Sequence, residues 1–185
     1  MTKALIVVDV QNDFCEGGSL AVAGGSQTAA GINALLNANP GYDYVVATRD
    51  HHIDPGAHFG DPPDYVDSWP PHCVVGTPGV EIHENLTGQS FDAVFDKGEY
   101  SAAYSGFEGA CAGVALEAWL AARNVEVVDV CGIATDYCVR ATALDAAARG
   151  FATTVLLGLT AAVAPANVPG VLSEFAAAGV AVKPA

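Results

Sequence analysis

Reactive side chains stand at the ends of four apolar stretches of this sequence that are rich in β-branched residues. These are Asp9, Asp50, Lys97 and Cys138, which close or follow the stretches 5–9, 44–48, 93–96 and 125–131. In an open parallel sheet, ligands bind outside the carboxyl ends of the strands, so groups placed there meet at one edge. A thiol, a carboxylate and an ammonium at one edge predict covalent catalysis by a cysteine that attacks a carbonyl carbon.

Cys138 is the predicted nucleophile because it follows a tight strand-to-helix turn and falls in the first turn of an expected helix. Unpaired N–H groups and the helix dipole at that position favour the thiolate, and a nearby Lys97 would lower the pKa of the thiol further. The same N–H groups can bind an oxyanion. A cysteine at this position can also be a small buried residue and nothing more. The convergence with Asp9 and Lys97 favours catalysis, whereas Cys131 lies inside a strand and is expected in the core.

Asp9 and Lys97 are the predicted partners of the nucleophile. Asp9 would take the proton of the thiol as a general base and then protonate the departing amine. Lys97 would hold both neighbours in their ionised forms. The alternatives are a capping or ion-paired carboxylate for Asp9 and a surface charge for Lys97.

One carboxylate and three imidazoles predict a metal site. Asp50 and His52 are two residues apart at a strand end, so their side chains face the same way, while His51 points to the opposite side. His58 and His72 come from an irregular segment rich in Pro, Gly, His and Asp. Carboxylate and imidazole ligands suit one divalent ion, Zn²⁺, Fe²⁺ or Mn²⁺. Solvated histidines in a polar loop are the alternative, and His83 lies outside the cluster.

The elements that must position these groups alternate along most of the chain. Two further strands are expected at 153–157 and 180–182, and helices are expected at 26–37, 110–123, 135–149 and 168–178. Ser26 is the expected N-cap of the first helix. This alternation predicts an α/β fold, a three-layer αβα sandwich with a central, mostly parallel sheet of about six strands. We expect a single domain over residues 1–185, with an irregular metal-binding insert at about 51–90.

Composition limits the classes of partner. The 185 residues include 21 acidic against seven basic side chains and carry a net charge of −14. Such a surface repels phosphate backbones, so no nucleic-acid partner is expected. No apolar run approaches the roughly 18–20 residues that cross a bilayer. Five cysteines, an odd number without a CxxC pair, predict free thiols and a cytoplasmic protein. A monomer or a small homo-oligomer is expected.

Several segments together resemble the nicotinamidase/pyrazinamidase family within the isochorismatase-like hydrolases. They are DVQNDFCEGGS at 9–19, TRDHHIDPGAH at 48–58, SWPPHC at 68–73, KG at 97–98, YSGFE at 104–108 and GIATDYCV at 132–139. The resemblance runs in order from residue 4 to about residue 163. It differs at Tyr137, where mycobacterial members carry His just before the nucleophile.

The resemblance implies hydrolysis of nicotinamide, and of pyrazinamide, to the carboxylic acid and ammonia in NAD salvage. It implies a triad of Asp9, Lys97 and Cys138, and metal ligands Asp50, His52, His58 and His72. It implies an oxyanion hole from the backbone N–H groups of Ala134 and Cys138, with a cis peptide between Ile133 and Ala134. The substrate contacts it implies are Phe14, Trp69, Tyr104, Ile133, Ala134 and Tyr137, and the metal would hold the pyridine nitrogen of a small aromatic amide.

Three other functions remain open on the sequence. The chain could be a hydrolase that uses a metal-bound water, with Cys138 only structural. It could act on another small amide or on a vinyl ether of the isochorismate type. It could also be a metal- or nucleotide-binding module without catalysis. The four-residue metal set argues against a different substrate, and the residues at three strand ends argue against a module without catalysis.

Overall fold

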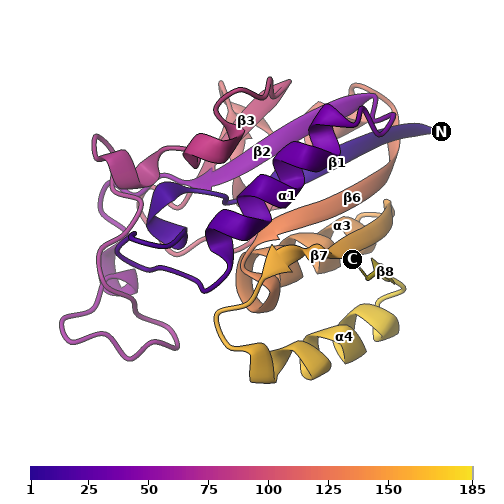
Figure 1. The fold of residues 1–185 in the computed structure, drawn as a ribbon. Helices are drawn as coiled ribbons and strands as arrows, with labels where there is room; N and C mark the ends of the chain where they lie inside the picture. Colours follow the sequence, from indigo (N-terminus) through magenta and orange to yellow (C-terminus); the bar gives the residue numbers. More distant parts are fainter. Residues whose placement is uncertain (185) are drawn as a thin grey trace.

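A computed structural model describes residues 1–184 and contains one eight-stranded sheet, in the order β5-β4-β3-β2-β1-β6-β7-β8. The strands that correspond to the six predicted ones are β1 (Thr2–Val8), β2 (Tyr44–Asp50), β3 (Ala93–Lys97), β6 (Val125–Ile133), β7 (Ala152–Ala161) and β8 (Ala181–Lys183). All of these pair in parallel. Their carboxyl ends therefore meet at one edge, where the long irregular loops gather on the left of Figure 1.

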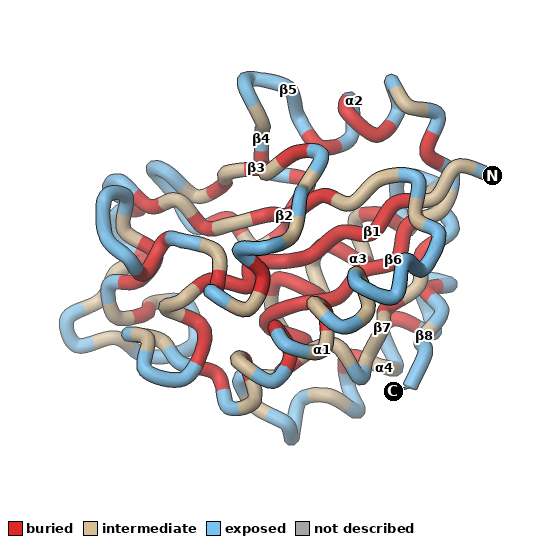
Figure 2. Tube along the Cα trace, turned by 45° about the horizontal axis from the view of Figure 1, so that its top comes forward, coloured by how far each residue is buried: buried red, intermediate tan, exposed pale blue. Residues whose placement is uncertain are grey.

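Helices cover both faces of the sheet, which confirms the predicted three layers (Figure 1). On one face, α1 (Gly25–Asn37) packs with Ala29 and Ile32 against the central strands. The other face is covered by α2 (Leu116–Ala121), α3 (Arg140–Ala148) and α4 (Val168–Ala177). The middle strands β1 and β6 are buried between these layers (Figure 2), as expected for near-continuous apolar runs in a parallel sheet.

The prediction of about six strands was too low, because residues 110–115 form a hairpin rather than the start of a helix. Its strands β4 (Ala110–Cys111) and β5 (Val114–Ala115) pair antiparallel with each other, and β4 pairs with β3. Ala112 and Gly113 both have positive φ, +48° and +79°, which is the conformation of a tight two-residue hairpin turn. The predicted helix 110–123 is therefore confined to α2.

The predicted N-cap of the first helix and the predicted first turn of the third helix were wrong. Ser26 does not cap α1; the Glu16 carboxylate instead accepts hydrogen bonds from the backbone N–H groups of Gly24 and Ser26, at 2.6 and 2.8 Å. Residues 135–139, expected as the first turn of an α-helix, form a π-helical turn in which Val139 N–H donates to Ala134 O at 3.0 Å. The α-helical part begins only at Arg140. Within residues 1–184, no helix is both long and apolar enough to cross a membrane.

Three 3₁₀ turns, η2 (Gly56–His58), η3 (Pro78–Val80) and η4 (Glu84–Leu86), interrupt the otherwise irregular segment between β2 and β3. Isolated bridges tie it together, with His52 paired to Val74 and Phe59 paired to Trp69. Both bridges involve residues next to, or among, the predicted metal ligands. The segment is therefore held in place over the sheet edge although it contributes no strand to the sheet.

Gly132 is required where β6 passes β1, just before the turn that contains the predicted nucleophile Cys138. A Cβ atom there would lie 2.1 Å from Val8 O, and φ is +116°, a region that side-chain-bearing residues rarely adopt. We expect Gly132→Ala to reduce the free energy of unfolding by about 3 kcal/mol or more, measured by urea denaturation. Gly170→Ala, at a position in α4 with nothing within 4 Å of the new Cβ atom, is the matched control and should be neutral or stabilising. Equal stability of the two variants would contradict this assignment.

Candidate active site

Lys97 is the centre of the site, because its ammonium contacts groups from three other strand ends. At the end of β3 and fully buried, Nζ lies 2.9 Å from Asp9 Oδ2 and 2.5 Å from Asp50 Oδ1. It donates to Ala103 O at 2.8 Å and lies 3.8 Å from Cys138 Sγ. The carboxylate, ammonium and thiol, separated by up to 129 positions between Asp9 and Cys138, are thus brought together around one nitrogen atom.

Asp9 is held at the end of β1 by its backbone and by its second carboxylate oxygen. Its φ of +48° turns the chain just after Val8, and Thr48 Oγ1 donates to Asp9 Oδ1 at 2.6 Å. Burial raises the pKa of Asp9, and Lys97 only partly opposes the shift. A carboxyl group whose pKa is raised toward neutrality is better matched to moving protons in both directions.

The protonation of Cys138 differs from the sequence-based expectation. Burial raises the pKa of its thiol well above the ordinary value, and the nearby Asp9 and Asp50 carboxylates add to the shift while Lys97 opposes it. The resting group is therefore a thiol rather than a pre-formed thiolate. Asp9 and Cys138 share Lys97 as a neighbour, so a carboxylate able to accept a proton lies close to the thiol.

The buried Lys97 stays charged despite its surroundings. Burial alone would lower the pKa of its ammonium, but Asp50 and Asp9 raise it well above the usual range. For Asp50, burial favours the neutral form, yet Lys97 and His52 lower the pKa of its carboxyl below the usual range. Asp50 is therefore an anion with one oxygen on the ammonium and the other available to a cation.

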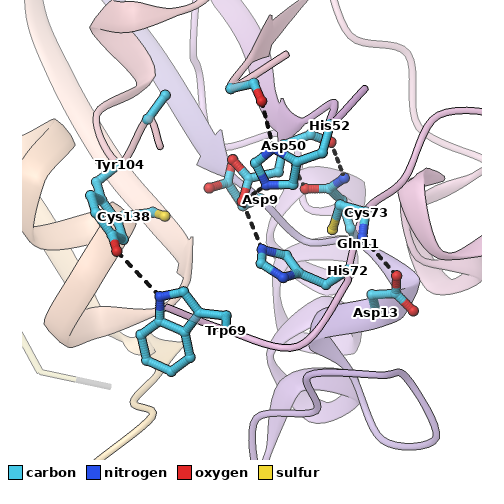
Figure 3. Close-up of polar contacts among 12 residues, drawn as sticks. Asp9, Gln11, Asp13, Asp50, His52, Trp69, His72, Cys73, Tyr104 and Cys138 are labelled. Carbon is cyan, nitrogen blue, oxygen red and sulfur yellow. Dashed lines mark hydrogen bonds and ion pairs between the residues drawn. The ribbon is translucent and has the colours of Figure 1, made fainter. Parts of the chain in front are cut away.

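That second oxygen faces the imidazoles predicted from the sequence. Asp50 Oδ2 lies 3.6 Å from His52 Nε2 and 3.8 Å from His72 Nε2, too far for hydrogen bonds. One ligand atom each from His52, His58 and His72 lie within 4.8 Å of one another. The Nδ1 atoms of His52 and His72 lie 2.5 and 2.8 Å from the backbone oxygens of Gly98 and Pro70, which directs each Nε2 atom inward (Figure 3).

The donor set fits one divalent metal ion. The buried atoms His52 Nε2 and His58 Nδ1 have no hydrogen-bond partner among the described residues, which suits nitrogen ligands rather than a hydrogen-bonded core. Burial and the two neighbouring imidazoles lower the pKa of His58 to about 4, so it is neutral at pH 7. The pKa of His72 is also lowered, chiefly by burial. Neutral imidazole is the form that binds metal.

A pocket of about 460 Å³, including its open mouth, leads to these groups. All six residues expected to contact substrate line it, together with four that the sequence did not suggest. The expected ones are Phe14, Trp69, Tyr104, Ile133, Ala134 and Tyr137, and the others are Leu20, Val22, Ala103 and Val163. Cys138, Asp50, His58 and His72 also reach the surface of the pocket, so the thiol and three predicted ligands face the same space.

Three aromatic side chains form one wall of the pocket. Trp69 Nε1–H donates to Tyr104 OH at 3.2 Å, and the Trp69 and Tyr137 rings pack edge to face with centroids 5.2 Å apart. The Tyr104 and Tyr137 centroids are 5.9 Å apart. Together with Phe14, these rings give walls suited to a flat, aromatic ligand. Leu20 and Val22 follow the 9–19 segment as apolar residues of a loop, and this pattern alone did not separate pocket lining from core.

The structure also agrees with the expectations for one peptide bond, for His51 and His83, and for the cysteines. The peptide between Ile133 and Ala134 is cis. His51 points away from the metal group, toward Glu99. His83 lies outside the group, where its Nδ1 accepts from the backbone N–H of Asn85. Cys131 is fully buried in the core, and all five cysteines are free thiols.

Known proteins resemble this chain in sequence and in fold. The isochorismatase domain family matches residues 3–183. The Mycobacterium tuberculosis nicotinamidase/pyrazinamidase is 55% identical over 179 residues, which is 96% of each chain. The structure of the L. infantum protein PnC1 in complex with nicotinate superposes with a TM-score of 0.88 at 39% identity, covering 99% of this chain and 92% of that one. The zinc complex of the Pyrococcus horikoshii pyrazinamidase gives 0.84 at 35% identity over 100% of both chains.

Proposed function

The chain belongs to the isochorismatase family, and from this premise we propose that it is a nicotinamidase that hydrolyses nicotinamide to nicotinate and ammonia. The observation that carries the proposal is the Lys97 ammonium, which contacts Asp9 at 2.9 Å and lies 3.8 Å from Cys138 Sγ beside an aromatic pocket. Similar proteins are nicotinamidases and pyrazinamidases by name. We therefore extend the substrate range to pyrazinamide and assign the activity to NAD salvage.

In the first half of the reaction, Cys138 Sγ transfers its proton to Asp9 as it attacks the amide carbon of the substrate. The backbone N–H groups of Ala134 and Cys138 stabilise the oxyanion that forms. Asp9 then gives the proton to the departing nitrogen, so ammonia leaves and a thioester to Cys138 remains. Lys97 stays charged throughout and stabilises the thiolate and the carboxylate in turn.

In the second half, Asp9 takes a proton from a water that attacks the thioester carbonyl. Collapse of the new tetrahedral intermediate releases nicotinic acid, which loses its proton to solvent as nicotinate, and the thiolate of Cys138 recovers a proton from Asp9. Asp50, His52, His58 and His72 would hold one divalent ion, Zn²⁺, Fe²⁺ or Mn²⁺. Such an ion would supply a Lewis acid for a ring nitrogen, and Trp69, Tyr104, Tyr137 and Phe14 would enclose the ring of the substrate.

Other properties of the protein follow from its charge and its thiols. Free cysteines suit a reducing compartment, which supports a cytoplasmic location. The net charge of −14 argues against nucleic acid as a partner. The partner that the pocket fits is a small aromatic amide, and a monomer or a small homo-oligomer would suffice because the described chain itself contains all proposed catalytic groups.

Ammonia release from nicotinamide by the Zn²⁺-reconstituted protein tests the function. We expect turnover of nicotinamide and pyrazinamide, with benzamide at least about tenfold poorer because it lacks the ring nitrogen. Chelation should reduce turnover by about 100-fold or more, and added Zn²⁺ should restore it. If the metal-loaded protein releases no ammonia from any of these carboxamides, the proposed function is wrong.

A further inference from the structure

Gln11 and Asp13 belong to the 9–19 segment but have no part in the chemistry described so far. We propose that they are positioning residues, which hold the metal ligands Asp50 and His72 in place through hydrogen bonds to the main chain. This inference rests on the proposed function, since it concerns the metal group of the same site. In Figure 3 both side chains lie beside that group, and a dashed line joins Asp13 to Cys73, the residue that follows His72.

The Gln11 side chain forms hydrogen bonds with the peptide groups on both sides of Asp50. Gln11 is fully buried; its Nε2 donates to Asp50 O at 2.8 Å, and its Oε1 accepts from Asp50 N–H at 2.8 Å. The second Nε2 hydrogen goes to Val80 O at 2.9 Å. Every polar hydrogen of this amide is therefore used, and two of its three bonds fix one residue.

The hydrogen bonds from Gln11 to Asp50 replace the strand pairing that β1 no longer supplies beside Asp50. The ladder between β1 and β2 ends at Val8 and Thr48, whereas Asp50 still pairs with Lys97 of β3 on its other side. On the β1 side, the Gln11 amide offers the donor and acceptor that another strand residue would have offered. Without the Gln11 amide, Asp50 would be paired with β3 alone. Its position matters because one oxygen of its carboxylate contacts Lys97 and the other faces the imidazole group.

Asp13 acts on the other side of the metal group. Its Oδ2 accepts from Cys73 N–H at 2.7 Å, directly after His72. Cys73 has a positive φ of +47°, and its carbonyl accepts from His52 N–H at 3.0 Å. One carboxylate thus fixes Cys73, the residue that links the segment bearing His72 to the segment bearing His52. The chain passes close by, since a Cβ atom at Gly79 would lie 2.0 Å from Asp13 Oδ2.

The residue between them provides an internal control. Asn12 Nδ2 donates to Pro78 O at 2.8 Å, which is the same kind of side-chain to main-chain bond in the same loop, but it ends on no metal ligand. Loss of the Asn12 bond should loosen the loop without disturbing the ligands. Loss of the Gln11 or Asp13 bonds should misplace them, and groups that orient metal ligands typically change metal affinity by about 10–100-fold.

Zn²⁺ affinity, measured by competition with a chromogenic chelator in the absence of substrate, tests the proposal. We expect Gln11→Glu to weaken Zn²⁺ binding about 10–100-fold, because a carboxylate would face the carbonyls of Asp50 and Val80. Asp13→Ala should weaken it to a similar degree, and Asp13→Asn less, since an amide oxygen still accepts from Cys73 N–H. Asn12→Ala should stay within about twofold of the parent protein. Thermal unfolding of each apo variant reports whether it folds.

The outcomes separate positioning from general stability. If Gln11→Glu fails to fold, the comparison of Asp13→Ala with Asp13→Asn still decides for Asp13, because that side chain is only partly buried. Parent-like Zn²⁺ affinity in a folded Gln11→Glu or Asp13→Ala variant overturns the role of that residue. Equal weakening by Asn12→Ala overturns the proposal as a whole. A parent protein that binds Zn²⁺ but releases no ammonia would refute the proposed function and leave this result standing.

Discussion

Replacement of Cys138 by alanine is expected to reduce ammonia release from nicotinamide at least about a thousandfold. The substitution removes the one sulfur that contacts Lys97 among the described residues, at 3.8 Å, and no serine or threonine lines the pocket to replace it as a nucleophile. The loss should appear in kcat, because the pocket walls and the metal group that we propose bind substrate are unchanged. Steady-state ammonia release measured over a range of nicotinamide concentrations separates kcat from KM.

The controls for this prediction come from the same chain. Cys131→Ala removes another buried thiol of the same strand region, one that lies in the core away from Lys97, and should retain turnover if the protein folds. Zn²⁺ affinity and the thermal midpoint of Cys138→Ala should stay close to those of the parent. Intact-mass spectrometry of a quenched parent reaction should detect a nicotinoyl adduct that the variant lacks. Near-normal turnover by Cys138→Ala would instead support a metal-activated water as the nucleophile.

Much of the site could be predicted from the sequence because strand ends are easy to recognise and parallel topology forces them together. Asp9, Lys97 and Cys138 each stand at or just beyond the end of a β-branched run, so their meeting required only the rule for parallel sheets. The same rule placed Asp50. The spacing of His52 two residues further on indicated its direction, because alternate residues of an extended chain face the same way.

The details that escaped prediction depend on long-range contacts. Whether residues 110–115 continue a helix or turn back as a hairpin is decided by pairing with β3, and alanine-rich sequence does not reveal that pairing. The cap of α1 comes from Glu16, eight residues before Gly24, and not from the adjacent Ser26. The high pKa of Cys138 reflects burial beside two carboxylates, which outweighs the favourable charge of Lys97. Burial of this kind exists only in the folded chain.

Gln11 shows the same limit at the level of a single side chain. In the sequence it is one polar residue in a polar loop, and no periodicity marks it as buried. It becomes interpretable once the structure shows that β1 has ended while β2 continues by two residues. The buried Gln11 amide then satisfies the rule that buried backbone N–H and C=O groups are paired, because it pairs with those of Asp50. The sequence alone does not show that these Asp50 groups lack a strand partner.

Lys97→Met is expected to lower the free energy of unfolding of the apoprotein by about 3–5 kcal/mol at pH 7 and to abolish turnover. The fully buried ammonium contacts both Asp9 and Asp50, and its removal leaves two carboxylates in the interior without a cation. The cost should depend on pH. In the parent, the lowered pKa of Asp50 contributes stability that is fully present above its unfolded pKa of about 4 and is lost only at lower pH, so this contribution is constant between pH 7 and 5. In the variant, the carboxyl pKa values rise, so protonation at lower pH relieves the repulsion.

The stability difference between parent and variant should therefore shrink as the pH falls from 7 toward 5, which urea denaturation in the presence of a chelator can measure. Lys3→Met is the matched control, because Lys3 lies 2.8 Å from the buried Asp129 but is itself one-third exposed. Tyr42 OH still donates to Asp129 at 2.6 Å in that variant, so the expected loss is only about 1 kcal/mol. A Lys97→Met difference that is equal or larger at pH 5 would mean that Lys97 does not offset the charge of the two buried carboxylates. A group other than Lys97 would then have to stabilise the Asp9 carboxylate during the proton transfers proposed for it.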